Sequence, residues 1–469
     1  PNYWDFQTKI AHRINKKLTL TFLGLGAIDE FNFGVPREAT PEKLYVLDAT
    51  PSINQWNYTV GASLRKQIAR GYWNLAFSRS MLDNSIEKFD GNQYGNETKR
   101  RTGIFSQEIE NKLRFDVNRS YNNYKISYGI VAQYVKNNND AFQRIRQEFR
   151  DVNGTLIQPA VIVKYASAIN FWRTGGFFQI SKRTLANRLS LSAGLRTDLN
   201  SFTTTGNNPL KTLSGRFNAS YTLSERWTLN ASIGNYFKIA PYTILSHTDN
   251  TGKFTNKDAN YTESIHYVAG IEYLPAPTTR FTLEGFYKRY KQVPISVRDG
   301  ISLANLGGDF TILGNEDVTT NGEGNAAGIE LFFQQKLTKR FFTTLSYTLF
   351  YSQYSGSNGK LIASAWDNRH LLSFLGGYKL KRNWEIGLKF RLQGGAPFTP
   401  FDMAASQLNY LTLGTGLLDY SRLNSQRLAP FHASDIRIDK KWNSKRDNRE
   451  NSTKCWASNC ADKKATVIC

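Results

Sequence analysis

The most regular pattern in this sequence is an alternation of apolar and polar residues from residue 384 to residue 394. Successive side chains of a β-strand point to opposite faces, whereas a helix would scatter both sets around its circumference. The apolar face would consist of Trp384, Ile386, Leu388, Phe390 and Leu392. The other face would consist of Glu385, Gly387, Lys389, Arg391 and Gln393. The pattern therefore predicts a strand, and a similar alternation over 372–380 predicts its hairpin partner across a short turn.

Two kinds of protein contain hairpins of this type. In a soluble β-sandwich the apolar face packs against a second sheet, and the polar face contacts water. In an outer-membrane β-barrel the apolar face contacts lipid, and the polar face lines the lumen. One hairpin taken alone favours the soluble sandwich. The repetition of the pattern and the lengths of the connections decide between the two.

The alternation recurs along most of the chain. Strand-like segments begin near residues 18, 73, 109, 124 and 189. Residues 140–160 are polar and irregular and are predicted to form a loop. Three further hairpins are predicted, in which 212–223 pairs with 227–237, 265–274 with 281–290, and 329–337 with 342–351.

The connections between these segments alternate in length. Short ones lie near residues 224, 276, 339 and 382. Long ones, rich in Gly, Asn, Ser, Thr and Asp, cover 239–260, 293–325, 353–367 and 395–429. A strict alternation places every long loop at the same rim, as in barrels with short periplasmic turns and long outer loops. The chain is therefore predicted to be all-β, as a transmembrane antiparallel up-and-down β-barrel.

Aromatic residues support this interpretation. Trp227, Phe341 and Trp384 each begin a predicted strand directly after a short turn. In a barrel these positions are where a girdle of aromatic side chains meets the membrane interface.

Composition excludes several other classes. Aromatic residues make up 13% and charged residues 21% of the 469 positions, which argues against disorder. No apolar run approaches the ~18 residues that a spanning helix needs. The mean hydropathy of −0.47 fits a barrel, because half of each barrel strand is polar.

The net charge limits the expected binding partners, and the positions of the cysteines indicate the cellular compartment. The net charge of +22 is spread over the polar faces and the connections, and no zinc-finger or RNA-binding signature occurs, so nucleic acid is not an expected partner. Lipid phosphates or an anionic cargo would suit the same charge. Cys455, Cys460 and Cys469 lie together near the C-terminus at spacings that match no zinc site. The cysteine-free remainder fits an oxidising compartment such as the periplasm.

Short phrases in a fixed order carry a resemblance to a known family. They are Asn235-Tyr236-Phe237 with Pro241-Tyr242, Tyr261-Thr262-Glu263-Ser264 with Tyr267, Gly270 and Glu272, Gly328-Ile329-Glu330, Asp367-Asn368-Arg369-His370, the segment 394–400, and Asn424, Arg427 and Pro430 with 435–438. In this order they resemble TonB-dependent outer-membrane receptors, large plugged barrels that import scarce nutrients. The resemblance spans most of the chain.

The resemblance implies a barrel of about 22 strands around an N-terminal plug. About 17 strands are expected here, with roughly four missing at the start and one at the end. The plug and the N-terminal box that engages the energy-transducing partner are not recognised. After Trp442 the sequence is polar and lacks alternation, so the last strand looks replaced. Residues 1–442 are assigned to the barrel, and residues 443–469 to a disordered tail outside it.

A search for catalytic or metal chemistry finds none. The five histidines are far apart and form no His-Glu-x-x-His pattern. No Gly-x-Ser-x-Gly element occurs, and residues 249–258 lack the spacing of an EF-hand loop. We therefore expect no catalytic, cofactor or metal site and no enzymatic activity.

The predicted lumen side provides the candidate site residues. They are charged positions of the polar faces, namely Glu110, Arg114, Glu330, Glu385, Lys389 and Arg391. Such residues contact a plug or a passing solute, or they form ion pairs within a solvated wall. For any single residue the second interpretation is favoured.

The predicted function is that of a receptor and transporter barrel of the bacterial outer membrane for energy-coupled uptake of a scarce nutrient. Its expected partners are outer-membrane lipid, an energy-transducing partner that spans the periplasm, and an extracellular ligand that the sequence does not identify. The alternative is a passive structural or adhesive outer-membrane barrel. An outer-membrane hydrolase is a third and weaker hypothesis, because no nucleophile and base are recognisable.

Overall fold

The computed structural model describes residues 2–146, 148–150, 153–307, 314–413, 416–443, 450–460 and 466–468. Within these ranges twenty strands form one large sheet. The strands of this sheet are β1 (Asn2–Asn15), β2 (Leu18–Phe31), β3 (Ser52–Ile68), β4 (Gly71–Phe89), β5 (Arg100–Ser120), β6 (Tyr124–Arg146), β9 (Val161–Thr184), β10 (Leu189–Asn200), β11 (Ser214–Thr222), β12 (Trp227–Lys238), β13 (Thr262–Ala276), β14 (Thr279–Ser296), β15 (Val318–Gln335), β16 (Phe341–Ser355), β17 (Leu361–Ala363), β18 (His370–Lys379), β19 (Trp384–Gln393), β22 (Phe431–Asn443), β23 (Glu450–Cys460) and β24 (Thr466–Ile468).

The remaining elements are short and lie in the connections. A small hairpin pairs β7 (Phe149–Arg150) with β8 (Leu156–Gln158), and a separate two-stranded sheet pairs β20 (Pro397–Phe398) with β21 (Gln426–Arg427). The helices are α1 (Pro41–Ala49), α2 (Tyr242–Leu245) and α3 (Met403–Leu413), with 3₁₀ turns η1 (Asp90–Asn92), η2 (Glu97–Lys99), η3 (Pro209–Thr212), η4 (Lys381–Asn383) and η5 (Tyr420–Arg422). Among the described residues, none of these helices is both long enough and apolar enough to span a bilayer.

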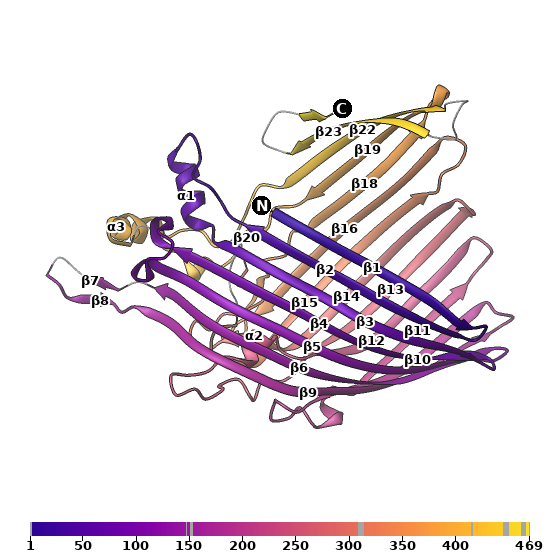
Figure 1. The fold of residues 1–469 in the computed structure, drawn as a ribbon, viewed down its shortest axis with the longest axis horizontal. Coiled ribbons are helices and arrows are strands. Elements are labelled where there is room, and N and C mark those ends of the chain that lie inside the picture. Colours follow the sequence, from indigo (N-terminus) through magenta and orange to yellow (C-terminus); the bar gives the residue numbers. More distant parts are fainter. Residues whose placement is uncertain are drawn as a thin grey trace.

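The long strands follow one another in an antiparallel meander. Each pairs with the neighbours that precede and follow it in the chain, and β6–β9, β16–β18 and β19–β22 continue the meander past the small elements. The four predicted hairpins are confirmed as β11–β12, β13–β14, β15–β16 and β18–β19. Figure 1 shows the resulting sheet curving around an interior. The all-β antiparallel fold is therefore confirmed.

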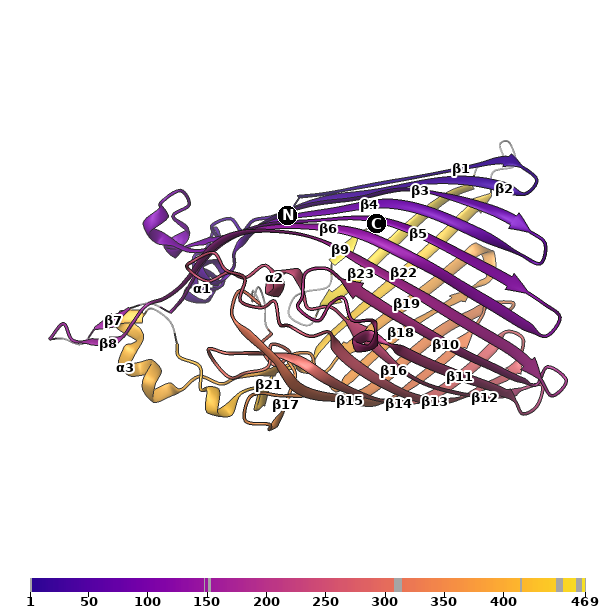
Figure 2. The ribbon, with the colours of Figure 1, turned by 90° about the horizontal axis from the view of Figure 1, so that it is seen from below.

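The predicted alternation of short and long connections is also confirmed. The tight turns between paired strands lie at the right of Figure 1, whereas α1, α2, α3 and the β7–β8 hairpin lie at the left. Figure 2 shows the same separation after a quarter turn. All long loops thus leave from one rim of the sheet.

The loop predicted for residues 140–160 begins later than expected. Strand β6 continues to Arg146 and pairs with β9 over its whole length. Ala141 is fully buried and packs with Ile104 and Tyr165, which explains why the strand persists through a polar sequence. The prediction was therefore wrong for residues 140–146, because polar strand ends that project from a membrane do not need an apolar face.

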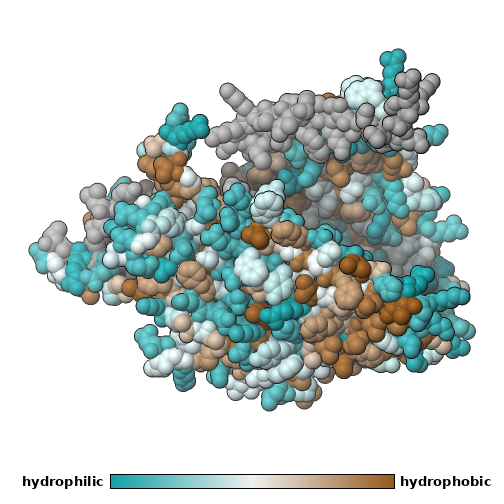
Figure 3. Space-filling model, in the orientation of Figure 1, coloured by the Kyte–Doolittle hydropathy of each residue, from teal (hydrophilic) through white to brown (hydrophobic). Residues whose placement is uncertain are grey.

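The register joins the apolar positions of all strands into one face. Leu388 pairs with Gly376 on β18 and with Ile436 on β22. Among the N-terminal strands Phe22 of β2 pairs on the same apolar face with Ile10 of β1 and with Ala62 of β3. Leu388 is 40% exposed, so no second layer of protein covers it. In Figure 3 hydrophobic side chains gather over the strands, and the end that carries the long loops is mostly hydrophilic.

Aromatic side chains cross this apolar face in a row near the short turns. Trp227 stacks on Tyr273 with 4.1 Å between ring centroids, and Phe281 stacks on Phe333 at 4.5 Å. Trp384 also lies on this face and is 42% exposed. Aromatic side chains thus lie at the positions where the girdle was predicted, at this end of the strands.

The C-terminal region contains one further long strand within the described residues. Glu450–Cys460 forms β23 and pairs with β22, from Ala433↔Cys460 to Asn443↔Glu450. Residues 444–449, 461–465 and 469 of the expected tail lie outside the described residues. No backbone pairing joins β1 to β23 within the described ranges. The division of the chain at residue 442 stays a prediction.

Candidate functional site

The six candidate residues lie on the face opposite the apolar one. Antiparallel partners share a face, so the register carries the assignment from strand to strand. Glu385 and Lys389 alternate with the outward Ile386 and Leu388 on β19. The same polar face carries Arg391 on β19, Glu330 on β15, and Glu110 and Arg114 on β5. Their contact with a plug or solute stays a prediction.

Glu110 and Arg114 line one concavity of about 280 Å³ in this inner wall. It lies between β5, β6, β9 and β10, and its charged residues of both signs are close together. Arg114 Nε lies 3.1 Å from Asp116 Oδ1, and Glu110 Oε1 lies 3.8 Å from Arg173 Nη1. These ion pairs make the wall polar and locally neutral.

The other four candidates lie elsewhere on the wall. Glu385 Oε1 is 3.8 Å from Arg437 Nη2, which also pairs with Asp439. Lys389 lies opposite Asp435 in the β19–β22 register. In the backbone register Arg391 lies opposite Ser373 and Ala433, and Glu330 lies opposite Glu284 and Thr348. The structure thus places Glu110 and Arg114 in one concavity and the other four candidates at other positions on the wall.

A long loop folds onto the inner wall directly above this concavity. Pro241 precedes α2, and Ile244 and Leu245 are 2% and 0% exposed. They pack with Val135 of β6 and Phe171 of β9, which belong to the inner face. We call this set the Tyr242 cluster; it consists of Val135, Ile169, Phe171, Ile239, Ala240, Tyr242, Ile244, Leu245, Ala259, Tyr261 and Leu303. Figure 2 shows α2 within the curve of the sheet.

The phenol of Tyr242 connects this loop to two charged groups of the wall. Its hydroxyl donates to Glu110 Oε1 at 2.8 Å and accepts from Arg173 Nη1 at 2.9 Å. Burial raises the pKa of Tyr242 above its usual value. The hydroxyl therefore keeps its proton and can donate to the carboxylate. A candidate wall residue, Glu110, is thus held by an outer loop.

A second set of polar contacts extends the cluster to the neighbouring loop. Asn139 Nδ2 donates to the hydroxyl of Tyr165 at 2.8 Å, and that hydroxyl donates to Asn315 Oδ1 at 2.9 Å. His247 stacks edge-on against Tyr165, and its Nε2 lies 3.5 Å from Asp317 Oδ1. Burial lowers the pKa of His247, with Asp317 and Asp249 acting in the opposite direction. The two loops and the ends of β6 and β9 therefore form one packed unit.

Three loops, one of which is the 297–317 loop that also contacts the Tyr242 cluster, meet around a buried carboxylate. Asp367 is fully buried, and its Oδ1 lies 2.9 Å from Arg369 Nε and 3.3 Å from Arg427 Nη2. Arg427 also donates to the carbonyl of Gly395 at 3.0 Å. Asn424 Nδ2 donates at 2.8 Å to the carbonyls of Asn305 and Ala363. We call this set the Asp367 cluster; it consists of Asn305, Ala363, Asp367, Arg369, Gly395, Asn424 and Arg427.

The sequence pointed to some of these residues without giving them a role. Tyr242, Asp367, Asn424 and Arg427 belong to the family-like phrases, and the structure shows what each of them contacts. Arg173 was missed, although its position on the polar side of β9 could have identified it. Within the described part of the chain, no three His, Cys, Asp or Glu side chains are placed to hold a metal ion.

Comparisons with known proteins agree with this architecture. A comparison with curated protein sequences found no match. The ferripyoverdine receptor of Pseudomonas aeruginosa has a TM-score of 0.65 and 13% identity over 99% of this chain and 61% of its own. The siderophore receptor PirA from Acinetobacter baumannii has a TM-score of 0.65 and 13% identity, covering 97% of this chain and 66% of its own. The copper transporter OprC has a TM-score of 0.63 and 14% identity, covering 99% and 66%.

These structures share the fold, and this chain spans about three fifths to two thirds of their length. The family model described as TonB dependent receptor-like, beta-barrel matches residues 4–448. That match covers nearly the whole chain and includes the wall and both loop clusters. The chain belongs to the TonB-dependent receptor β-barrel family, a family of receptors and transporters, and its place is the bacterial outer membrane.

Proposed function

We propose that this chain is the barrel portion of a receptor that captures a scarce nutrient at the cell surface for energy-coupled uptake. Family membership supports the receptor and transporter class. The finer proposal is carried by one observation, the attachment of the 239–261 loop to Glu110 and Arg173 through Tyr242. This contact links the rim where a ligand arrives to the wall along which it would pass.

The inner wall suits this task because it is polar and several of its charges are paired. The ion pairs of Arg114 with Asp116 and of Arg196 with Asp198 leave a solvated surface without a strong local charge. A solute that moves along such a wall contacts hydrogen-bonding groups and no apolar surface that would retain it. Glu110 and Arg114 would contact the plug or the solute, and the other four candidates would form the remaining wall.

The plug, the box that engages the energy-transducing partner, and that partner itself belong to the intact receptor in this proposal. The loops would hold the ligand, and energy from the inner membrane would move the plug. The relatives include a ferripyoverdine receptor and a copper transporter, so ferric chelates and copper form the first panel of cargoes.

The test uses the full-length gene in cells that lack their own copy. Uptake of radiolabelled ferripyoverdine, ferric alcaligin and copper ions is measured with and without the TonB partner. The proposal expects uptake of at least one cargo that is lost without TonB. Uptake of no cargo, combined with TonB-independent attachment of cells to surfaces, would favour the passive or adhesive barrel instead.

A variant connects the assay to the structure. Tyr242→Phe removes the hydroxyl that joins the loop to Glu110 while the ring keeps its packing against Phe171. If the loop attachment serves uptake, this variant changes the uptake rate while cell-surface amounts stay equal. The matched control is Tyr267→Phe on the outward face, which is 47% exposed.

A further inference from the structure

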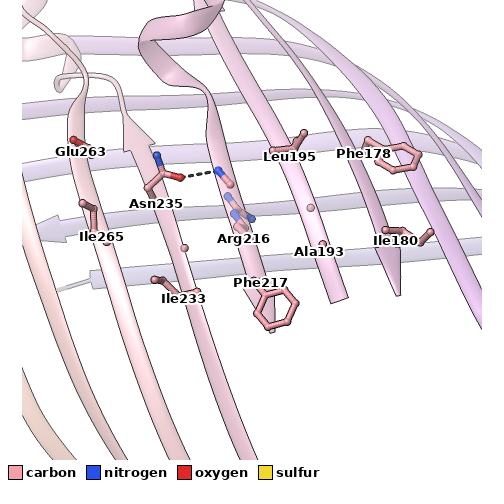
Figure 4. A pocket seen from close by; sticks show the side chains of 13 residues that line it. Phe178, Ile180, Ala193, Leu195, Arg216, Phe217, Ile233, Asn235, Glu263 and Ile265 are labelled. Atoms are coloured by element: carbon pink, nitrogen blue, oxygen red, sulfur yellow. Dashed lines mark hydrogen bonds between the residues drawn. The ribbon is translucent and has the colours of Figure 1, made fainter. Parts of the chain in front are cut away.

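An apolar groove of about 730 Å³ crosses the outward face of the sheet between β9 and β13. Its lining residues belong to the neighbouring strands β9, β10, β11, β12 and β13, and Figure 4 shows their side chains. Its floor contains Ala193 and Gly215. Its walls are exposed apolar side chains, namely Phe178, Ile180, Leu195, Phe217 and Ile233.

The groove exists because small residues stand between large ones in the register. Gly215 pairs with Leu195, and Ala193 pairs with Phe217. A Cβ atom built on Gly215 would meet nothing closer than 3.9 Å. The space above Gly215 is therefore open to a Cβ atom, and a larger side chain at this position would project into the groove.

The groove reaches the rim that carries the long loops. Its upper end is closed by Asn235, whose Oδ1 accepts from the amide of Gly215 at 2.6 Å (Figure 4). Just before Gly215 the chain forms η3, which is held at the end of β10 by a 2.8 Å hydrogen bond from Thr197 Oγ1 to the carbonyl of Pro209. Lys211 of η3 is exposed, and so is its neighbour Leu210, at 77%.

Lys211 lies four residues before Gly215, in η3, which contacts β10. The acidic residue of the lining, Glu263, is 3.8 Å from Lys291 Nζ and is thereby neutralised. No ion pair of Lys211 occurs among the described residues. An apolar groove together with an exposed ammonium group in the turn that leads into β11 matches the acyl chain and the anionic headgroup of a lipid.

We propose that this groove binds one anionic membrane lipid, with an acyl chain on Ala193 and Gly215 and the headgroup phosphate beside Lys211. The groove is continuous with the apolar face of a chain that resides in the outer membrane, so its occupant comes from the bilayer. The inference rests on that location and is independent of the proposed uptake, because lipid binding is measured without any cargo.

Native mass spectrometry of the full chain in detergent tests the proposal, with dimyristoylphosphatidylglycerol and dimyristoylphosphatidylcholine as the two probes. The chain is expected to retain one phosphatidylglycerol molecule in preference to phosphatidylcholine. Gly215→Leu fills the groove and is expected to weaken retention about tenfold. Lys211→Glu is expected to remove the preference for phosphatidylglycerol while phosphatidylcholine binding persists.

The matched control is Gly285→Leu. Gly285 also lies on the outward face, has open space above it and is outside the groove, so its substitution should leave retention unchanged. Ala193→Leu fills the groove from the neighbouring strand and carries the test if circular dichroism shows that Gly215→Leu has lost strand content. Unchanged retention in the groove variants, equal retention of both lipids by the unmodified chain, or a dimer of the chain in place of a lipid adduct would each overturn the proposal.

Discussion

The two loop clusters at the outer rim are built in opposite ways. The Asp367 cluster is organised around a fully buried carboxylate, two guanidinium groups and several backbone carbonyls. The Tyr242 cluster is organised around apolar packing, and one phenol provides its link to the charged wall. The first joins three loops to one another, whereas the second joins the 239–261 loop mainly to the strands beneath it and, through Leu303, to one of those three loops.

This difference predicts that the Asp367 cluster is a fixed part of the structure and that the contact made by Tyr242 can be released. Removing one of the two guanidinium groups leaves the buried Asp367 carboxylate with less compensation for its charge, which costs up to several kcal/mol. Breaking the Tyr242 contacts leaves Glu110 and Arg173 to pair with each other, since they are already 3.8 Å apart. We therefore expect the 239–261 loop to be the easier of the two regions to detach, and the following predictions test that order.

The largest effect is expected for Arg427→Ala in the Asp367 cluster. The substitution leaves the buried carboxylate with Arg369 as its remaining cation and removes the donor to Gly395. The free energy of unfolding should fall by about 3 kcal/mol, measured by denaturant titration of the folded chain in detergent micelles. Arg422→Ala, in the same loop at an exposed position, should change it by less than about 0.5 kcal/mol. Equal effects of both substitutions would remove the distinction between the clusters.

Substitutions in the strands that lie between the loop clusters and the short turns give a reference value for the change in the free energy of unfolding. Leu388→Arg places a charge on the lipid face and should destabilise by ~2–4 kcal/mol if the residue lies at the bilayer midplane. Lys389→Leu, on the polar face, should be far milder. Refolding titrations into lipid vesicles measure both, and equal tolerance at the two positions would contradict the assignment of the faces.

A smaller effect is expected for Tyr242→Phe. The hydroxyl makes one hydrogen bond to a carboxylate and one to a guanidinium, and such bonds contribute ~1.5–3 kcal/mol each when no replacement exists. Because Glu110 and Arg173 can pair directly, the loss should be about 1 kcal/mol and confined to the loop. Hydrogen exchange of residues 239–261 should accelerate while that of residues 356–369 stays unchanged. Acceleration in both regions would show that the clusters act as one unit.

The smallest effect is a pH dependence of the same loop. The pKa of His247 is lowered below its ordinary value of 6.5 in the folded chain, mainly by burial. Below that pH the unfolded loop binds a proton that the folded loop does not, so stability is lost as the pH falls from 6.5 through the lowered pKa. Limited proteolysis of the 239–261 loop should be faster at about pH 5 than at about pH 7.5. His247→Gln should abolish the difference; if the difference remains in this variant, another group is responsible.

Periodicity in the sequence was enough to predict the wall. One face of a strand such as β19 contacts lipid and the other contacts water. Apolar and polar residues therefore alternate from Trp384 to Gln393. The same argument placed Glu110 and Lys389 on the polar face. It failed at residues 140–146, where β6 rises beyond the apolar zone and pairing is maintained by Ala141 and Tyr165 instead.

The contacts of the loops could not be predicted in this way. Tyr242 and Glu110 are 132 residues apart, and Asn424 and Asn305 are 119 apart. No periodic signal connects such positions, since loops leave one rim and meet by tertiary packing alone. The family-like phrases marked several of these residues without showing which of them touch.

The Asp367 cluster also determines where this surface is free to diversify. Asn424 and Arg427 tie the bases of three loops to one another through backbone carbonyls, whose geometry does not depend on neighbouring side chains. Between those anchored bases, α3 projects Met403 and Leu408 with exposures of 64% and 84%. New residues or insertions at this tip would alter what the cell surface recognises and leave the anchoring contacts intact.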